Sequence, residues 1–375
     1  MFRKKKWKSN AGTENARGSA QIFSDCHKDQ PPEIFRRHRL TKQIFRSDGI
    51  FEPLTECFPQ RLVIIGAGII GCEYATIFSH FSQTKVWLVD HASRVIPYED
   101  EDLSEFVRIH LLRKGVRVIH SAKLREIVKY TDYIQVILDF DDGHSQVIEA
   151  DAALISIGRT VDLSHLGLEN LGITAKSGLL DTDENCCVRD HIYAAGDITH
   201  NPALVNIAEM EGRYAVKHMY GCTTWPLRYD NMSTVMFFYP PVAAVGLNEK
   251  GCRKNKIPFR VAWYSNILCN RAIAMRSTEG FVKIIVTDDE NRRILGMRAA
   301  GPQVSSTIMS IAHFMDQEKG VPDVLKSVYP HPTVTEGIQE CLRMLMNKSV
   351  FKPFAFPDYL KIRCWDPEKG YTDIS

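Results

Sequence analysis

Three glycines in the first half of the chain have the spacing of a dinucleotide-binding loop. Gly66, Gly68 and Gly71 form a GxGxxG pattern directly after the apolar run Leu62–Ile65. The first glycine permits a tight turn, the second lets backbone N–H groups approach a pyrophosphate, and the third allows a helix to pack closely on the strand. The helix would direct its positive N-terminal end at the phosphates. The pattern favours a nucleotide site over a purely structural glycine turn.

Asp90 indicates which dinucleotide would bind. It stands nineteen residues after Gly71, at the end of the next predicted strand. An acidic side chain at this position can accept a hydrogen bond from the ribose 2′-hydroxyl and repels a 2′-phosphate, so the pattern favours NAD over NADP. Arg94 would suit NADP, but a solvated loop arginine is the simpler interpretation.

Two weaker patterns each allow a functional and a structural interpretation. In the Ala-Gly-Asp sequence at 195–197, Asp197 could bind a ligand polyol or cap the turn before the next helix. Glu336 could orient the imidazole of His331, the arrangement that a general base requires. Alternatively, Thr333 caps a helix and Glu336 closes a capping box, which leaves His331 as an ordinary surface histidine. From these residues alone, the structural interpretation is favoured in both cases.

The elements that position these residues alternate between strands and helices. The expected elements cover residues 62–65, 69–80, 85–89, 101–114 and 116–120. Such alternation predicts an α/β fold, with βαβ units on a parallel sheet of Rossmann type. Short segments at 124–129, 133–139 and 146–149 then predict an antiparallel appendage. Together they give the NAD domain a three-layer β-β-α character.

The second half of the chain has a different pattern of predicted helices and strands. A strand and glycine turn at 192–197 and a helix at about 203–219 lead into β-rich segments from 234 to 300, followed by helices near 303–318 and 334–346. This predicts an α+β domain with its own core. The expected division is a poorly ordered lead-in (1–47), the NAD-binding domain with its entry connector (48–160), a central segment (161–228), the α+β domain (229–350) and a C-terminal tail on the surface (351–375).

Composition narrows the class of protein. Among 375 residues, 44% are hydrophobic and the net charge is +2, so neither nucleic acid nor a membrane is expected as a partner. The ten cysteines include no CxxC or CxxxxC pair, which favours free thiols in a reducing compartment over a disulfide framework or a zinc site. No metal is expected. The basic N-terminus lacks a following apolar core, so we predict a cytoplasmic protein, with organelle targeting as the alternative.

The order and spacing of these motifs resemble the class I pyridine nucleotide–disulfide oxidoreductases, the family of dihydrolipoamide dehydrogenase and soluble pyridine nucleotide transhydrogenase. The resemblance runs from about residue 58 to about residue 352. It implies that residues 161–228 are a remnant of the family's FAD or central domain and that residues 229–350 are its dimerisation domain. It implies that Glu73 lies near the contact between nicotinamide and flavin, and that Gly158 belongs to a strand-end GR motif. It further implies that Gly196 and Asp197 form the second FAD motif, in which the aspartate binds the ribityl chain.

The resemblance also implies an activity and a partner. Leu204 and Val205 match the helix start whose amides face the flavin, so both FAD and NAD are the implied cofactors. The implied reaction is hydride transfer from NADH to flavin, with a small molecule or a dithiol as the electron acceptor. The C-terminal domain would form a homodimer, in which His331, oriented by Glu336, acts as acid–base catalyst in the partner's active site.

The sequence departs from the family pattern in its first part. No glycine motif precedes Gly66, and Cys26 and Cys57 do not form the family's redox-active CxxxxC pair. Without that pair, the family's thiol–disulfide half-reaction is not expected of this chain alone. The alternative is therefore a truncated, catalytically inactive paralogue or gene fragment that binds NAD and dimerises.

Overall fold

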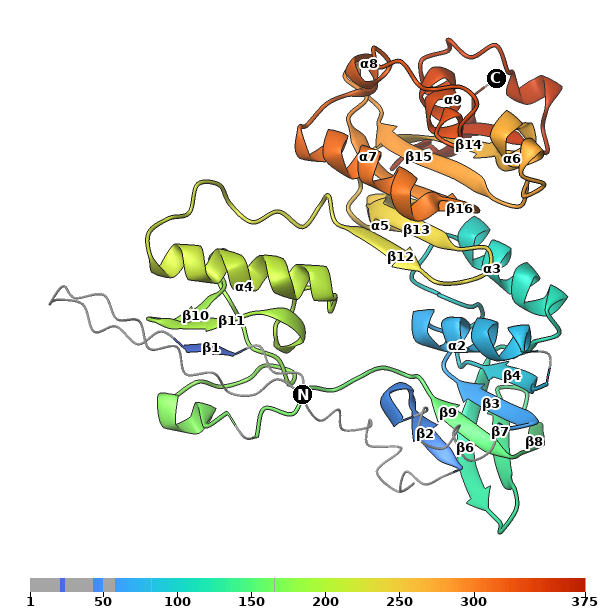
Figure 1. The fold of residues 1–375 in the computed structure, drawn as a ribbon, viewed down its shortest axis with the longest axis vertical. Coiled ribbons are helices and arrows are strands. Elements are labelled where there is room, and N and C mark those ends of the chain that lie inside the picture. Colours follow the sequence, from blue (N-terminus) through green and yellow to red (C-terminus); the bar gives the residue numbers. More distant parts are fainter. Residues whose placement is uncertain (1–20, 24–42, 50–57, 82, 165, 375) are drawn as a thin grey trace, which may run out of the picture. The chain divides into compact units, whose positions relative to one another are not determined.

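The computed structural model describes residues 21–23, 43–49, 58–81, 83–164 and 166–374 (Figure 1). These residues form two compact units. The smaller unit contains residues 159–228 and the strand β1 (Gln21–Phe23), and the larger contains the described residues of 35–158 and 229–375. Most of the predicted lead-in lies outside the described residues. Among the described helices, none is long and apolar enough to cross a membrane.

A five-stranded parallel sheet forms the centre of the NAD-binding part. Its order is β2 (Ile44–Arg46), β9 (Ala152–Ile155), β3 (Arg61–Ile65), β4 (Lys85–Val89) and β5 (Arg117–Ile119). The strands are almost continuously apolar because both faces of the sheet are covered. The sheet starts at Ile44, within the predicted lead-in, so the expected domain start at residue 48 was too late.

The two covering layers have different architectures. Helices α2 (Ile69–His80) and α3 (Glu101–Arg113) pack on one face through residues such as Phe78 and Leu103. A separate antiparallel sheet of β6 (Ala122–Lys129), β7 (Ile134–Phe140) and β8 (Ser145–Ala150) covers the other face. The predicted three-layer β-β-α arrangement is therefore confirmed.

A seven-stranded antiparallel sheet forms the rest of the larger unit. Its order is β12 (Ser233–Met236), β13 (Val242–Gly246), β16 (Ile294–Ala300), β15 (Phe281–Thr287), β14 (Phe259–Ser265), β17 (Leu360–Asp366) and β18 (Gly370–Asp373). Helices α7 (Val304–Asp316) and α9 (Glu336–Leu345) pack on one face. The shorter helices are α5 (Glu249–Lys254), α6 (Asn270–Ala274) and α8 (Val321–Val324).

One predicted boundary in this unit was wrong. The segment 351–375, expected as a surface tail, supplies β17 and β18, and Leu360 is only 1% exposed in the core beneath α9. The expected separate core of the C-terminal part is present between the antiparallel sheet and the helices α7 and α9. In addition, Met236 and Phe281 of the antiparallel sheet share a second hydrophobic cluster with Phe78 and Leu103 of the NAD-binding part.

The smaller unit has a three-stranded sheet covered by one long helix. β11 (Ile192–Ala194) pairs antiparallel with β10 (Cys187–Arg189) and parallel with β1. The helix α4 (Val205–Met219) follows the 3-10 turn at Gly196–Ile198. The unit's limits at residues 159 and 228 lie close to the predicted 161 and 228. Its partner strand β1 comes from the segment that was expected to be an unstructured lead-in.

Candidate cofactor and catalytic sites

The glycine loop between β3 and α2 is closely packed against its neighbours. Gly66 has a φ of +106°, and a Cβ there would lie 2.6 Å from the carbonyl oxygen of Ser156. A Cβ on Gly71 would lie 1.8 Å from the carbonyl oxygen of Gly66. The Ser156 hydroxyl donates to the carbonyls of Ile65 and Gly66 at 2.9 Å each. Only glycine fits at positions 66 and 71, as a dinucleotide loop requires.

Gly68 differs from these two glycines because the space around its Cα is open. No heavy atom lies within 4 Å of a Cβ built there. It is the N-cap residue of α2, which has no side-chain cap and no acidic residue in its first turn. The positive end of α2 is therefore available to an anion rather than neutralised by the chain. Gly158, at the end of β9, also has a positive φ and open space.

Asp90 lies at the end of β4, beside the glycine loop. Its Oδ2 accepts from the backbone N–H of Ala67 at 2.5 Å, and its Oδ1 from that of Ala92 at 2.7 Å. These bonds fix the carboxylate next to the loop. Oδ1 also lies 3.1 Å from Nδ1 of His91, while Oδ2 keeps a further acceptor site. Arg94 donates to the carbonyls of Pro97 and Glu99, so its role in the structure is to brace the next loop.

Glu73, two residues beyond the last glycine, connects α2 to the antiparallel sheet. Its Oε1 accepts from the backbone N–H of Phe237 at 2.9 Å, and burial raises the pKa of its carboxyl group. Nearby, a cavity of about 150 Å³ is lined by Ile69 of α2, by Tyr98 and by Met236. Burial also raises the pKa of Tyr98, whose hydroxyl interacts with the backbone N–H of Ile69. The sequence pattern gave no sign of Tyr98.

The structure brings His331 and Glu336 together. Nδ1 of His331 lies 2.8 Å from Oε1 of Glu336, while Oε2 of Glu336 accepts from the backbone N–H of Thr333 at 2.9 Å. The imidazole is 63% exposed, whereas the carboxylate is mostly covered. The hydroxyl of Thr333 donates to the carbonyl of Pro330. One carboxylate thus contacts both the histidine and the backbone of the turn before α9. The N-cap residue of α9 is Thr335, so the predicted capping box with Thr333 as N-cap is not formed.

In the smaller unit, the turn that carries Asp197 is held by a buried acid. Glu211 of α4 is fully buried, and its two oxygens accept from the backbone N–H of Gly196 at 2.6 Å and from Nδ2 of Asn201 at 2.7 Å. Gly196 has a φ of +79°, and a Cβ there would press on Ala208. Asp197 itself is partly exposed. Sequence reasoning missed Glu211, which lies fourteen residues further on inside a regular helix.

The start of α4 presents its backbone amides without a side-chain cap. Leu204 is the N-cap residue, no acidic residue follows in the first turn, and Val205 is 87% exposed. This helix end and the turn at Asp197 belong to the same small unit. Their chemistry suits a ligand with hydroxyl and electron-rich groups.

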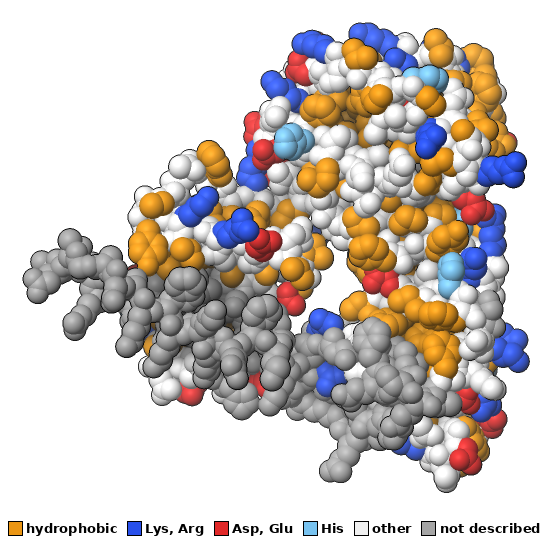
Figure 2. All heavy atoms as spheres, in the orientation of Figure 1, with side chains coloured by type: hydrophobic (Ala, Val, Ile, Leu, Met, Phe, Trp, Pro, Cys, Tyr) orange, Lys and Arg blue, Asp and Glu red, His pale blue; other side chains and the backbone are white. Residues whose placement is uncertain are grey.

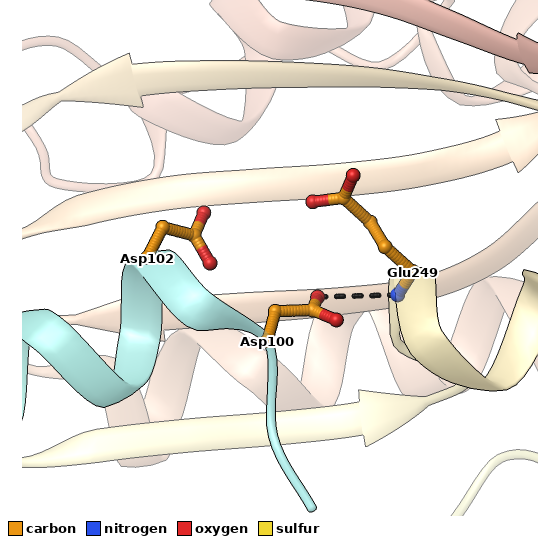
Figure 3. A group of neighbouring side chains, drawn as sticks. All are labelled: Asp100, Asp102 and Glu249. Atoms are coloured by element: carbon orange, nitrogen blue, oxygen red, sulfur yellow. Dashed lines mark hydrogen bonds between the residues drawn. The ribbon is translucent and has the colours of Figure 1, made fainter. Parts of the chain in front are cut away.

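A separate cluster of acids lies between α3 and α5. Figure 3 shows the carboxylates of Asp100, Asp102 and Glu249 pointing toward a common centre. Nζ of Lys283 occupies that centre, at 2.8, 2.6 and 3.0 Å from the three residues in that order. Because this ammonium already contacts all three acids, the cluster is an ion network that joins the NAD-binding part to the antiparallel sheet.

Comparisons with known proteins identify relatives of the chain. The model of the pyridine nucleotide–disulphide oxidoreductase family matches residues 27–212, and that of the family's dimerisation domain matches residues 232–342. A dihydrolipoyl dehydrogenase of Bacillus subtilis is 31% identical over 82% of this chain and 65% of its own length. A leghemoglobin reductase of Glycine max is 29% identical over 82% of this chain and 58% of its own length.

Solved structures agree with these sequence relatives. LpdA from Mycobacterium tuberculosis has a TM-score of 0.76 and 26% identity, covering 84% of this chain and 68% of that one. The flavoprotein disulfide reductase RclA from Escherichia coli has a TM-score of 0.72 and 26% identity, and the match covers 81% of this chain and 68% of RclA. The chain therefore spans between 58% and 68% of the length of these four relatives.

Proposed function

Because the chain belongs to the pyridine nucleotide–disulphide oxidoreductase family, we propose that it is an oxidoreductase that uses NAD(H) and FAD. The glycine loop carries the proposal: positions 66 and 71 have no space for a side chain, while position 68 is open beside the positive end of α2. The relatives are named as dehydrogenases and reductases. Their names favour an active oxidoreductase over the catalytically inactive paralogue.

The NAD-binding residues have distinct roles in this proposal. The backbone at Gly68 and the first turn of α2 would hold the pyrophosphate, and the carboxylate of Asp90 would accept from the adenosine ribose. That carboxylate would also repel a 2′-phosphate, so NAD is preferred over NADP. Glu73, anchored on the Phe237 amide, would face the nicotinamide end of the cofactor.

Residues of the smaller unit suit FAD. Asp197 would accept from ribityl hydroxyls, and the uncapped amide of Val205 would face the electron-rich edge of the flavin ring. The N–H of Leu204 already donates to the carbonyl of Pro202 at 2.9 Å, so Leu204 would contribute to this site through its position at the helix start. Glu211 would keep this turn in place through its bond to Gly196. When bound, FAD supplies the two-electron acceptor for the hydride of NADH.

His331 and Glu336 would serve the second half of the reaction, in which electrons pass to a small-molecule acceptor or to the disulfide form of a dithiol. Glu336 fixes the imidazole through Nδ1, which leaves Nε2 to exchange a proton with the acceptor. We expect replacement of Glu336 by Gln to lower turnover by about a hundredfold, near the lower end of the contribution of general acid–base catalysis. NADH binding should not change.

We further propose that the chain forms a homodimer through its antiparallel domain. The match to the dimerisation-domain model supports this, as do large exposed apolar side chains such as Met309 (53%) and Val328 (95%). Figure 2 shows hydrophobic side chains between the charged ones on this unit. The exposed His331 would become enclosed only when a second copy covers it.

The nucleotide site can be tested with two matched glycine substitutions. Gly68→Ala has room for its methyl group but would hold the pyrophosphate away from the backbone, so the NADH Kd should rise at least about tenfold at unchanged melting temperature. Gly212→Ala, in open space on α4, is the control and should leave the NADH Kd unchanged. Calorimetry of NADH binding and thermal unfolding of the full chain provide both readouts.

The oxidoreductase proposal fails if Gly68→Ala binds NADH as well as the parent chain does. The FAD assignment has its own test, in which FAD is titrated into the full chain and flavin fluorescence is followed. Replacement of Asp197 by Ala should weaken FAD binding and leave NADH binding intact. Equal FAD affinity in both proteins would refute the role of Asp197.

A further inference from the structure

A large cavity lies away from the nucleotide and histidine sites. Its volume is about 550 Å³, within the range of pockets that hold small organic molecules. Its floor is formed by alternate residues of three adjacent strands: Phe281 and Lys283 of β15, Val261 and Trp263 of β14, and Lys361 and Arg363 of β17. The intervening residues, such as Tyr264 and Ile362, face the core beneath α9, so the cavity lies on the opposite face of the sheet.

The floor of the cavity is aromatic. The ring of Trp263 stacks on Phe281 with centroids 5.4 Å apart, and Phe106 of α3 meets Phe281 edge-on at 5.6 Å. Nε1 of Trp263 is buried and has no hydrogen-bond acceptor among the described residues. Such a surface favours a planar aromatic ligand, because stacking adds to the free energy gained from burial.

The acidic groups around the cavity already have cationic partners. Asp102 and Glu249 contact Nζ of Lys283. Glu105 receives two bonds from the guanidinium of Arg108, at 2.6 and 2.7 Å. The other two acids of the lining also have cationic contacts, because Asp100 shares Lys283 and Glu101 lies 3.4 Å from Arg94.

The cation of Lys361 has a different environment. Its Nζ lies 5.4 Å from the centre of the Trp263 ring, and no carboxylate within the described part of the chain forms an ion pair with it. Arg363, two residues along the same strand, contacts Glu249 only at 3.4 Å. The exposed ammonium of Lys361 lies above the indole ring, and the guanidinium of Arg363 lies nearby. Together these two cations offer two contacts for the anionic end of an aromatic molecule.

We propose that this cavity binds a small planar aromatic carboxylate. The ring system would lie on the floor formed by Trp263 and Phe281, and the carboxylate would be held by Lys361 with Arg363. Strands β17 and β18, which supply Lys361, Arg363 and Tyr371 to the cavity, come later in the chain than residue 342, where the match to the dimerisation-domain model ends. The proposed site is thus built in part by a segment outside that match, and it is independent of the NAD and FAD sites.

The test compares two probes of the same shape and opposite charge. 2-Naphthoate should bind the full chain in a saturable manner by calorimetry, and 2-naphthylmethylammonium should bind at least about tenfold more weakly. The variant Lys361→Gln removes the charge and should weaken naphthoate binding by about tenfold, the order expected for one charge-assisted contact. Lys369→Gln, in the turn of the same hairpin, is the matched control and should behave as the parent chain.

A second readout places the ligand. The indole N–H resonance of Trp263, identified by its loss in Trp263→Phe, should shift on addition of naphthoate with the same midpoint as in calorimetry. The proposal is overturned by absent saturable binding at millimolar naphthoate, by equal affinity for the two probes, by unchanged binding in Lys361→Gln, or by a Trp263 resonance that does not move. Thermal unfolding of each variant verifies that it remains folded.

Discussion

Replacement of Lys283 by Met should strongly destabilise the larger unit. The lysine side chain is 1% exposed, and its ammonium lies within 3.0 Å of carboxylate oxygens from Asp100, Asp102 and Glu249. Methionine fills a similar volume without the charge. Two of the three carboxylates, those of Asp100 and Glu249, are only 4% exposed and would be left close together without their shared counter-ion.

The size of the effect follows from the cost of leaving buried charges unpaired. Removal of one partner from a buried ion pair typically costs about 3–5 kcal/mol. Asp100 keeps bonds from the backbone N–H groups of Glu249 and Lys250, and Glu249 keeps the hydroxyl of Tyr371. We therefore expect about 3 kcal/mol, the lower end of that range, and a melting temperature lower by roughly 10 °C.

Urea unfolding followed by circular dichroism measures this change. The control is Lys123→Met, because Lys123 pairs with Asp141 at 2.6 Å on the surface, where both side chains are more than half exposed. Its expected cost is far smaller, because solvent screens an exposed ion pair. The double variant Lys283→Met, Asp100→Asn should recover part of the loss, since it removes one of the repelling charges. Equal costs for the two lysine variants would refute the argument.

The pH dependence provides an independent check. Burial alone would raise the pKa of Asp100, but the charge and hydrogen bond of Lys283 outweigh it and hold the pKa below its ordinary value. This carboxyl group therefore stabilises the fold above its unfolded pKa of about 3.9, and the stabilisation is lost as the pH falls through the lower folded value. The difference in unfolding free energy between the parent chain and Lys283→Met should accordingly shrink below about pH 4.

Three further substitutions test other parts of the structure. Tyr371→Phe removes the hydroxyl that donates to Glu249 at 2.7 Å and should cost about 1.5–3 kcal/mol in urea unfolding; no change would mean that water replaces it. Leu360→Ala should cost about 2–5 kcal/mol, because this side chain is 1% exposed, whereas a negligible cost would make the C-terminal strands a surface attachment. Asp90→Ala should reduce the preference for NADH over NADPH by at least about tenfold in calorimetry, and an unchanged ratio would remove Asp90 from cofactor selection.

The features that the sequence predicted well depend on short-range patterns. The strand, glycine loop and helix around Gly66 follow from the local alternation of apolar runs and glycines, and the structure reproduces them at 61–65 and 69–80. The limits of the other predicted strands of the Rossmann sheet and of its helices differ from prediction by only a few residues for the same reason, whereas the short edge strand β2 was not predicted.

No short-range sequence pattern predicted the ion network around Lys283. Lys283 is separated from Asp100 by 183 residues and from Glu249 by 34. No local spacing connects a strand lysine with acids at two helix starts. Their meeting depends on how the antiparallel sheet packs on the NAD-binding part, through a hydrophobic cluster that contains residues from both.

The C-terminal strands were missed although the sequence carries a signal for them. In Leu360–Asp366, the apolar residues Leu360, Ile362 and Cys364 alternate with Lys361 and Arg363, which is the pattern of a strand with one buried face. The prolines at 353, 357 and 367 are typical of an irregular surface segment, which is why a tail was predicted there. They lie outside the strand, where proline does not interrupt the hydrogen bonds of the sheet.

Glu336 serves the histidine and the backbone together because a carboxylate has two oxygens. Oε1 contacts His331 and Oε2 receives the Thr333 amide. The backbone bond restricts the carboxylate, and the carboxylate in turn restricts the imidazole, so the turn before α9 orients the histidine. Glutamine at position 336 has a single oxygen acceptor and can keep only one of these two bonds. Any loss of turnover in such a variant therefore has to be compared with its loss of stability before it is assigned to proton transfer.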